Sequence, residues 1–346
     1  MSTGSFTIAA LGDIMIQQRP EATDIASVAA LLEPYDLVIG NVDLVVSQLG
    51  TSTQKWANLN GPRELAHDVK AMGIDAVSMA NNHSMDFRAE GMLDACQAYD
   101  EAGVIHAGAG INLAAASAPV FIPAGDRTIA FLSVACTLPP ESAAGPNWPG
   151  IAPLPVHQAP EFEASLMLEQ PGSVARSKTW VDEEALVRVT SDIARAREQA
   201  DIVIVALHCG VPAPWRAPSQ PMLQDYEQPV CHALIDAGAD AVIGNHAHEL
   251  HGMEVYKERP IAYCLGNFWI GSLSDYAWME RETVIWELTF TPGNSVPAVS
   301  LRTLKMNEAG LPEIDATGTA ANLLSERSEG IQFSKLGDAR YQLVAR

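Results

Sequence analysis

Residues 240–248 read DAVIGNHAH, an apolar run that ends in two histidines separated by one residue. The apolar part is typical of a buried strand, and a strand end places side chains i and i+2 on one side. We therefore expect His246 and His248 to approach one ion or two neighbouring ions. For an isolated His-x-His pair, exposed or hydrogen-bonded loop histidines are an equally good interpretation, so the rest of the chain must decide.

Short β-rich runs alternate with helical patterns along the chain, which predicts an α/β fold. The final strands follow one another without intervening helices, so a mixed sheet or two stacked sheets is favoured over a purely parallel sheet. The expected strands lie at residues 6–11, 37–40, 76–79, 129–134, 202–207, 241–243, 261–265, 284–290 and 299–304, and the expected helices at 24–32, 62–72, 89–102, 182–199 and 226–237.

Two stretches interrupt this alternation. Residues 137–160 are rich in proline, which excludes regular structure throughout and predicts a long loop, a candidate lid over a substrate pocket. From residue 315 to 346 the periodicity is lost, which predicts an irregular C-terminal tail.

The composition limits the partners and the compartment. Lys and Arg number 21 against 42 Asp and Glu, and the net charge of −21 repels nucleic acid and anionic membrane surfaces. No apolar run approaches the roughly 20 residues of a membrane span, and the N-terminus lacks the pattern of a signal peptide. The five scattered cysteines form no Cys-x-x-Cys pair, which argues against a disulfide framework and favours a reducing cytoplasm.

Polar residues follow six of the expected strands at the point where each strand ends. Ligand sites in α/β proteins lie beyond the carboxyl ends of strands, so we expect these side chains to meet at one edge. They are Asp13, Asn41 with Asp43, Asn82 with His83, His208, His246 with His248, and Asn267.

This mixture of carboxylate, imidazole and carboxamide suits zinc, manganese or iron, and the lack of a thiolate cluster argues against a closed structural zinc site. We expect a catalytic site for one or two divalent ions. Two ions about 3.5–4 Å apart would activate a water molecule and polarise the substrate.

Six segments together resemble the CapA family, named for poly-γ-glutamate capsule synthesis. The family is similar to the calcineurin-like metallophosphoesterases, so the resemblance implies a four-layer α/β/β/α sandwich with metals at the strand ends, formed by residues 1–314 as a single domain. The segments are GDIM at 12–15, GNVD at 40–43, ANNHSMD at 80–86, LHCG at 207–210, GNHAH at 244–248 and IAYCLGNF at 261–268.

The resemblance also implies roles for individual residues. His83 resembles the histidine that meets the substrate or protonates the leaving group. Asp13 and His248 resemble ligands of a first metal, Asn82 the Asn ligand, and His208 and His246 the histidine ligands of a second metal.

The chain departs from the metallophosphoesterase pattern at two ligand positions. Met15 stands where a histidine ligand is expected, and Asn41 stands where the bridging aspartate is expected. Asp43, two residues after Asn41, is the candidate replacement for the missing carboxylate.

Other residues near the motifs are candidates for positioning or substrate contact. Asp86 either orients His83 or caps the helix that follows, and the cap is favoured. Trp215 lies among prolines and either lines an apolar pocket or packs in the core or under the lid. Strand alternation turns Cys209 away from His208, so this residue is either a small core residue or part of the pocket lining. The predicted substrate contacts are His251, Asn267, Trp215 and, if it lines the pocket, Cys209.

Two functions fit these observations. The first is a soluble metal-dependent hydrolase of a small-molecule ester, lactone, amide or phosphoester. The second, which the family name favours, is a non-catalytic protein of capsule or poly-γ-glutamate assembly that binds polymer or a partner membrane protein. The hydrolase is favoured because assembly proteins of this kind normally carry an N-terminal anchor, and this chain shows none. Its dispersed Arg and Lys residues make a carbonyl substrate at least as plausible as a phosphate.

Overall fold

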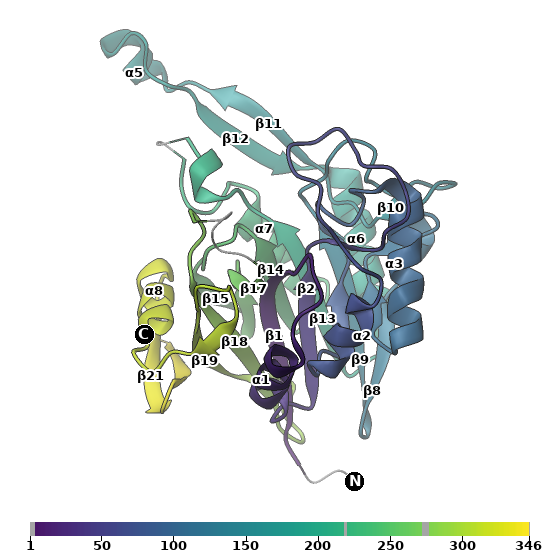
Figure 1. The fold of residues 1–346 in the computed structure, drawn as a ribbon. Helices are drawn as coiled ribbons and strands as arrows, with labels where there is room; N and C mark the ends of the chain where they lie inside the picture. The colour runs from purple at the N-terminus through teal and green to yellow at the C-terminus, as the bar shows by residue number, and fades with distance from the viewer. Residues whose placement is uncertain (1–3, 218–219, 272–276, 346) are drawn as a thin grey trace.

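The structure is a computed structural model that describes residues 4–217, 220–271 and 277–345. Its mixed α/β class confirms the prediction from the alternating pattern. Two sheets dominate the fold (Figure 1).

The larger sheet carries the N-terminal strand at its centre. On one side of β1 (Phe6–Met15) the neighbours are parallel, and on the other side they are antiparallel. The parallel strands are β2 (Leu37–Val42), β5 (Ala76–Ser78) and β6 (Ile105–Ala107), and the antiparallel ones are β18 (Glu282–Phe290), β19 (Ala298–Met306), β22 (Arg340–Ala345) and β21 (Ile331–Gly337). Two short strands join this sheet beside the main path, β17 (Asn267–Ile270) on β1 and β20 (Pro312–Ile314) on β19.

The second sheet has a parallel centre and two antiparallel edges. Its parallel strands are β9 (Arg127–Ala135), β13 (Ile202–Cys209), β14 (Ala241–His246) and β16 (Arg259–Ala262), and its edges are β8 (Val120–Ala124) and β15 (Met253–Tyr256).

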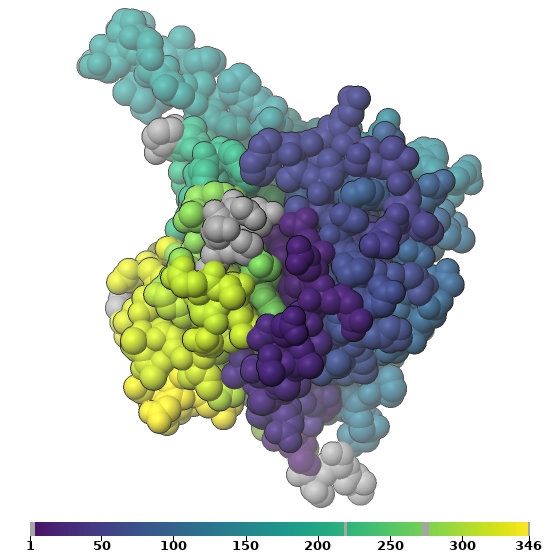
Figure 2. Space-filling model, in the orientation of Figure 1, coloured from purple at the N-terminus to yellow at the C-terminus, as the bar shows by residue number. Residues whose placement is uncertain are grey.

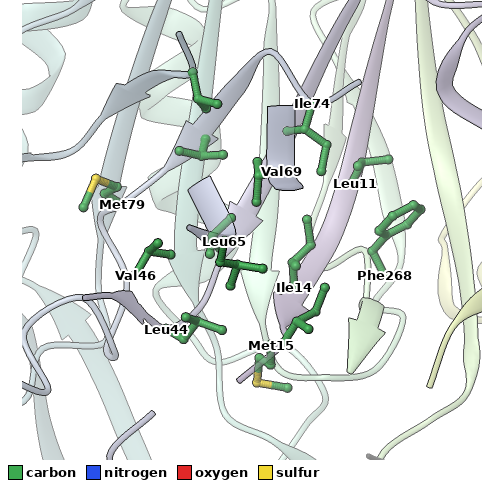
Figure 3. Packing of buried hydrophobic residues seen from close by; sticks show 14 of the residues in the cluster. Leu11, Ile14, Met15, Leu44, Val46, Leu65, Val69, Ile74, Met79 and Phe268 are labelled. Atoms are coloured by element: carbon green, nitrogen blue, oxygen red, sulfur yellow. The ribbon is translucent and has the colours of Figure 1, made fainter. Parts of the chain in front are cut away.

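The described residues form three hydrophobic core clusters, which follow strand alternation. Along β1, Ile8 and Ala10 pack in a cluster that also contains Phe131 of the second sheet, whereas Ala9 and Leu11 pack in a cluster shared with helices. Figure 3 shows Leu11 and Ile14 of β1 together with Leu65 and Val69 of helix α2. The helices of this cluster are α1 (Ala22–Leu32), α2 (Leu65–Ala71) and α3 (Arg88–Ala102), and the third cluster joins the second sheet to α6 (Glu183–Arg197) and α7 (Glu227–Asp236).

The strand expected at 261–265 begins and ends earlier, as β16, because the chain crosses from one sheet to the other after residue 262. After β16 ends at Ala262, residues 263–266 lead to β17, which pairs in parallel with β1. Gly244 makes room for the crossing, since a Cβ at this position would lie 2.0 Å from the Tyr263 carbonyl oxygen.

Part of the proline-rich segment expected to form a loop belongs to a projecting arm. Strands β11 (Val156–Glu161) and β12 (Arg176–Val181) pair only with each other among the described strands, and helix α5 (Ala164–Glu169) lies at the tip. The arm stands away from the body of the molecule (Figures 1 and 2). The residues before it, 137–155, contain the short strand β10 (Gly150–Ile151), which pairs with β7 (Ala109–Gly110).

The C-terminal segment is regular, which corrects the expectation of an irregular tail after residue 315. Helix α8 (Thr319–Arg327) buries Ala320, Ala321 and Leu324, and the hairpin β21–β22 extends the larger sheet through β19. These elements are short and half exposed, so they leave little periodicity in the sequence. Within the described residues, no helix is both long and apolar enough to cross a membrane.

Candidate metal centre

The parallel strands of both sheets end at a common edge, and the polar residues predicted from the sequence meet there. Asp13 lies on β1 of the larger sheet and accepts a hydrogen bond at Oδ2 from the backbone N–H of His246, at the end of β14, at 3.1 Å. Asn41 on β2 places its Nδ2 3.4 Å from Nδ1 of His208 on β13. The centre therefore lies on the seam between the two sheets, and all four of these residues are buried.

A local irregularity of β1 fixes Asp13. The register of β1 shifts around this residue, and its backbone N–H donates to the Gly266 carbonyl at 2.9 Å. The preceding Gly12 is required for this approach, because a Cβ there would lie 2.4 Å from the same carbonyl oxygen. Nδ2 of Asn41 donates to Asp13 Oδ1 at 2.8 Å and holds this carboxylate in place, while metal binding through the amide oxygen of Asn41 stays a prediction.

Three buried donors form a group of the size that one metal ion needs. One ligand atom each from Asp13, Asp43 and His248 lie within 4.8 Å of one another. Burial opposes protonation of His248, but the hydrogen bond and the charge of Asp13 raise the pKa of its imidazole. This set of two carboxylates and one imidazole is typical of divalent cation sites.

Asp43 supplies the strongest indication that this group needs a cation. Both carboxylate oxygens are buried and have no hydrogen-bond partner among the described residues. Burial, reinforced by the charge of Asp13, raises the pKa of the Asp43 carboxyl to about 6. A buried carboxylate without partners is costly, and a bound cation would offset that cost, so the residues present fit a divalent ion.

A second set of donors lies beside the first. Nε2 of His208 is 2.7 Å from Asn82 Oδ1 and 3.8 Å from Asp43 Oδ1, and the ring centroids of His208 and His246 are 4.7 Å apart. Burial, with the neighbouring histidines adding to it, lowers the pKa of both rings well below the usual range. Both rings are therefore neutral near pH 7, and each keeps a lone pair that can bind a metal ion. The buried Nδ1 of His246 has no hydrogen-bond partner among the described residues.

The backbone of the His-x-His segment is strained. His246 and His248 have φ angles of 106° and 56°, values that residues other than glycine rarely adopt. The two rings lie 5.8 Å apart as a result of this loop geometry rather than of simple strand alternation. Strained residues of this kind cluster at functional sites, where the surrounding structure holds them in place.

Asp86 orients His83, which corrects the expectation that it caps a helix. Its Oδ2 lies 2.6 Å from Nδ1 of His83 and accepts a hydrogen bond from the backbone N–H of Leu59 at 2.7 Å. The helix that follows, α3, has Phe87 at its N-cap and no side-chain capping bond. Lys55, which no motif marked, donates to Asp86 Oδ1 and to the Asn82 carbonyl and so completes this group.

A cavity of about 250 Å³ opens beside the centre. The buried histidines His83, His246 and His248 contribute to its lining together with Trp56 and other aromatic and apolar side chains. Trp215 belongs to this lining, at the place where the sequence interpretation allowed an apolar pocket.

The other three predicted substrate contacts lie outside this lining. Cys209 is buried in the core and its Sγ faces the Glu227 carboxylate at 3.9 Å, because strand alternation turns it away from His208. His251 is buried next to Glu249, with 3.5 Å between Nε2 and Oε1. Asn267 holds His248, since its Oδ1 lies 2.8 Å from Nδ1 of that ring and its Nδ2 donates to the His248 carbonyl at 2.9 Å.

Comparison with known proteins gives one family and several relatives. The family described as "Bacterial capsule synthesis protein PGA_cap" matches residues 7–272, a range that contains every motif described above. The uncharacterized protein y4sH of Sinorhizobium fredii is 30% identical over 312 residues, which cover 78% of this chain and 67% of that protein. The capsule biosynthesis protein CapA of Bacillus anthracis is 25% identical over 96% of this chain and 76% of its own length. The PGA biosynthesis protein CapA of Bacillus subtilis is 28% identical over 75% of this chain and 61% of its own length.

Proposed function

This chain belongs to the bacterial capsule synthesis family PGA_cap, and on that premise we propose that it is a metal-dependent hydrolase. Its substrate is a small molecule with an ester, lactone, amide or phosphoester bond. We also propose that its two sheets and their helices form the four-layer α/β/β/α sandwich of the metallophosphoesterases, supported by the three core clusters.

The observation that carries the proposal is that neither carboxylate oxygen of Asp43, inside the donor group, has a hydrogen-bond partner in the part of the chain that the structure describes. A carboxylate buried without a hydrogen bond serves no purpose in packing, because an apolar residue would fill the same space at lower cost. Asp13, Asp43 and His248 would hold one ion, and Asn82, His208 and His246 would hold a second. A divalent ion of manganese, zinc or iron would act as a Lewis acid and lower the pKa of a bound water.

His83 supplies the acid or electrophile in this proposal. Asp86 engages Nδ1 of the ring, which leaves Nε2 as the atom that faces other partners, and the residue lines the cavity. When both ring nitrogens carry a proton, an imidazole held in this way would donate the Nε2 proton to a leaving group and return to the neutral form. Pro139 also lines the cavity, which supports a lid role for the segment that contains it.

The five unpaired cysteines support a cytoplasmic location.

The alternative is a non-catalytic protein that binds polymer during capsule assembly. It is supported by the names of the two Bacillus relatives. The two functions differ in turnover, since an assembly protein of this kind would release no product.

Metal analysis of the purified chain tests the proposal. We expect bound divalent metal in the parent protein, a large loss of metal in Asp43→Asn, and unchanged metal in Glu287→Gln, a control carboxylate that is buried but fully hydrogen-bonded. In a screen with added Mn²⁺ or Zn²⁺, His83→Ala should keep its metal and lose roughly 10²–10⁴-fold in kcat. A parent protein that takes up no divalent ion would contradict the proposal, and metal without turnover on any ester, amide or phosphoester would favour the assembly role.

A further inference from the structure

Three tryptophans from separate parts of the chain gather at the cavity beside the metal centre. Trp56, Trp215 and Trp278 all line it, although they are more than 60 residues apart in the chain. Ring centroids are 5.8 Å apart between Trp56 and Trp215 and 5.2 Å apart between Trp215 and Trp278, in edge-to-face arrangements. Trp278 in turn lies 6.0 Å from the ring of His248. The aromatic row therefore leads from the surface to a residue of the donor group.

These rings are not needed to fill the core. Trp56 is 81% exposed and Trp215 is 54% exposed, and Trp278 is also exposed. Single exposed apolar residues are ordinary, but a contiguous group of large aromatic side chains at a cavity marks a surface that binds an apolar partner. The rest of the lining supports this, since Met15, Leu59 and Met279 are apolar as well.

The charge of the lining is unsuited to a polyanion. Lys55 is the single Lys or Arg among the described residues of the cavity lining, and its ammonium group is already paired with Asp86. Arg216, the neighbour of Trp215 in sequence, is bound to Glu249 at 2.6 Å. Within a chain of net charge −21, a substrate that carries many carboxylates would find no free cation among the described residues of this lining.

From these observations we infer that the substrate is recognised through an uncharged aromatic group that lies along the tryptophan row and directs the adjacent ester or amide bond to the metal centre. The inference deepens the proposed hydrolase function and rests on it for the reaction, but the recognition of the aromatic group stands on the row alone. Among the described residues of this lining no free Lys or Arg side chain is available to a poly-γ-glutamate chain, so the side chains favour the aromatic group over such a polymer.

Binding measured by titration calorimetry tests the inference on the full chain, with and without Mn²⁺. The probes are N-(2-naphthyl)acetamide, a neutral aromatic amide, and a tetra-γ-glutamate peptide. We expect the naphthyl probe to bind at least about 10-fold more tightly than the peptide, because ring stacking and apolar burial act in its favour alone. Equal or tighter binding of the peptide to the metal-free protein would overturn the inference, since with Mn²⁺ the carboxylates of the peptide also bind the ion.

Matched tryptophan variants locate the binding. Trp215→Ala and the highly exposed Trp56→Ala should each weaken naphthyl binding by about 3- to 10-fold, the effect of losing one aromatic contact. Trp180→Ala is the control, because Trp180 is 44% exposed but lies on the arm, outside the cavity lining. If Trp215→Ala does not fold, Trp56→Ala alone still tests the inference. If Trp56→Ala and Trp180→Ala weaken naphthyl binding equally, the inference is contradicted.

The same data separate this inference from the proposed function. Tryptophan-dependent binding in a protein without metal or turnover would overturn the hydrolase and leave aromatic recognition in place. Metal and turnover with binding that none of the cavity tryptophans affects would overturn aromatic recognition and leave the hydrolase in place.

Discussion

At the scale of single residues, Asp43 has opposite effects on the metal-free and the metal-bound protein. Without an ion its carboxylate is buried beside Asp13 with no hydrogen-bond partner among the described residues, and its pKa is raised to about 6. The folded protein therefore carries an unfavourable charge above that pH and loses it by protonation below that pH. With an ion, the same charge becomes a ligand.

Asp43→Asn should therefore stabilise the metal-free protein and weaken the metal-bound one. At pH 7.5 in a chelator, we expect the melting temperature of the variant to exceed that of the parent by a few degrees. This corresponds to a gain in the free energy of unfolding on the order of 1–2 kcal/mol. At pH 5 the difference should shrink, because the parent carboxyl is then protonated. Added Mn²⁺ should raise the melting temperature of the parent more than that of the variant. A variant less stable than the parent in chelator would show that Asp43 has partners of its own.

The sequence predicted the site residues that follow buried strands, and it missed Lys55 and Trp56, which lie in a loop. Asp13, His208 and His246 meet because parallel strands bring their carboxyl ends to one edge. Lys55 and Trp56 lie in a loop that no periodicity describes, and they touch residues distant in sequence. An Asp that follows a histidine by three residues and precedes a helix can either cap that helix or hydrogen-bond to the histidine. The sequence alone could not decide between these roles for Asp86, because the choice depends on the backbone at the start of the helix.

At the scale of elements, burial decided which strands and helices were predictable. The strands β1, β9, β13 and β18 and the helices α3 and α6 lie within a few residues of their predicted bounds, because each has a strongly buried face. The arm strands β11 and β12 have no such face, since most of their residues are exposed or half-buried. Without a buried face there is no alternation in the sequence to detect.

The arm should be dispensable for folding and for metal binding. Replacing residues 157–180 by an Asn-Gly turn between the paired Val156 and Val181 would remove the hairpin and keep its base. The deletion would break the half-exposed ion pair between Arg176 of the arm and Asp225 of the body, which contributes less than about 1 kcal/mol. We expect a melting temperature within a few degrees of the parent and equal metal content. Loss of cooperative unfolding would show that the arm supports the core.

At the scale of the whole molecule, one buried acid outside the metal centre should shape the dependence of stability on pH. Glu227 lies at the start of α7 and accepts hydrogen bonds from the backbone of Gln224 and from Cys209. Burial raises the pKa of its carboxyl to about 8 from an ordinary value of 4.5. Between these values the folded protein keeps a proton that the unfolded chain has released, so the stability contributed by this group falls as pH rises.

Glu227→Gln should remove this dependence while keeping the oxygen that accepts from Gln224. Urea unfolding in chelator at pH 5, 6.5 and 8 would give the free energy of unfolding of both proteins. We expect the parent to lose stability relative to the variant by up to about 1.4 kcal/mol per pH unit across this range. A difference that stays constant with pH would mean that the Glu227 carboxyl is ionised in the folded protein throughout this range, as it is in the unfolded chain.

The position of the metal centre on the seam between the sheets has a consequence for the order of folding. Asp13 and His246 touch across 233 positions of sequence, so the centre closes a loop of most of the chain. Contacts of such long range form late, because the entropy of closing the loop must be overcome before they contribute any stability. A cation added to the unfolded chain would find no assembled binding site and would have no means to guide the early steps. Its effect would begin once both sheets are in place, when it would slow their separation and so prolong the lifetime of the finished molecule.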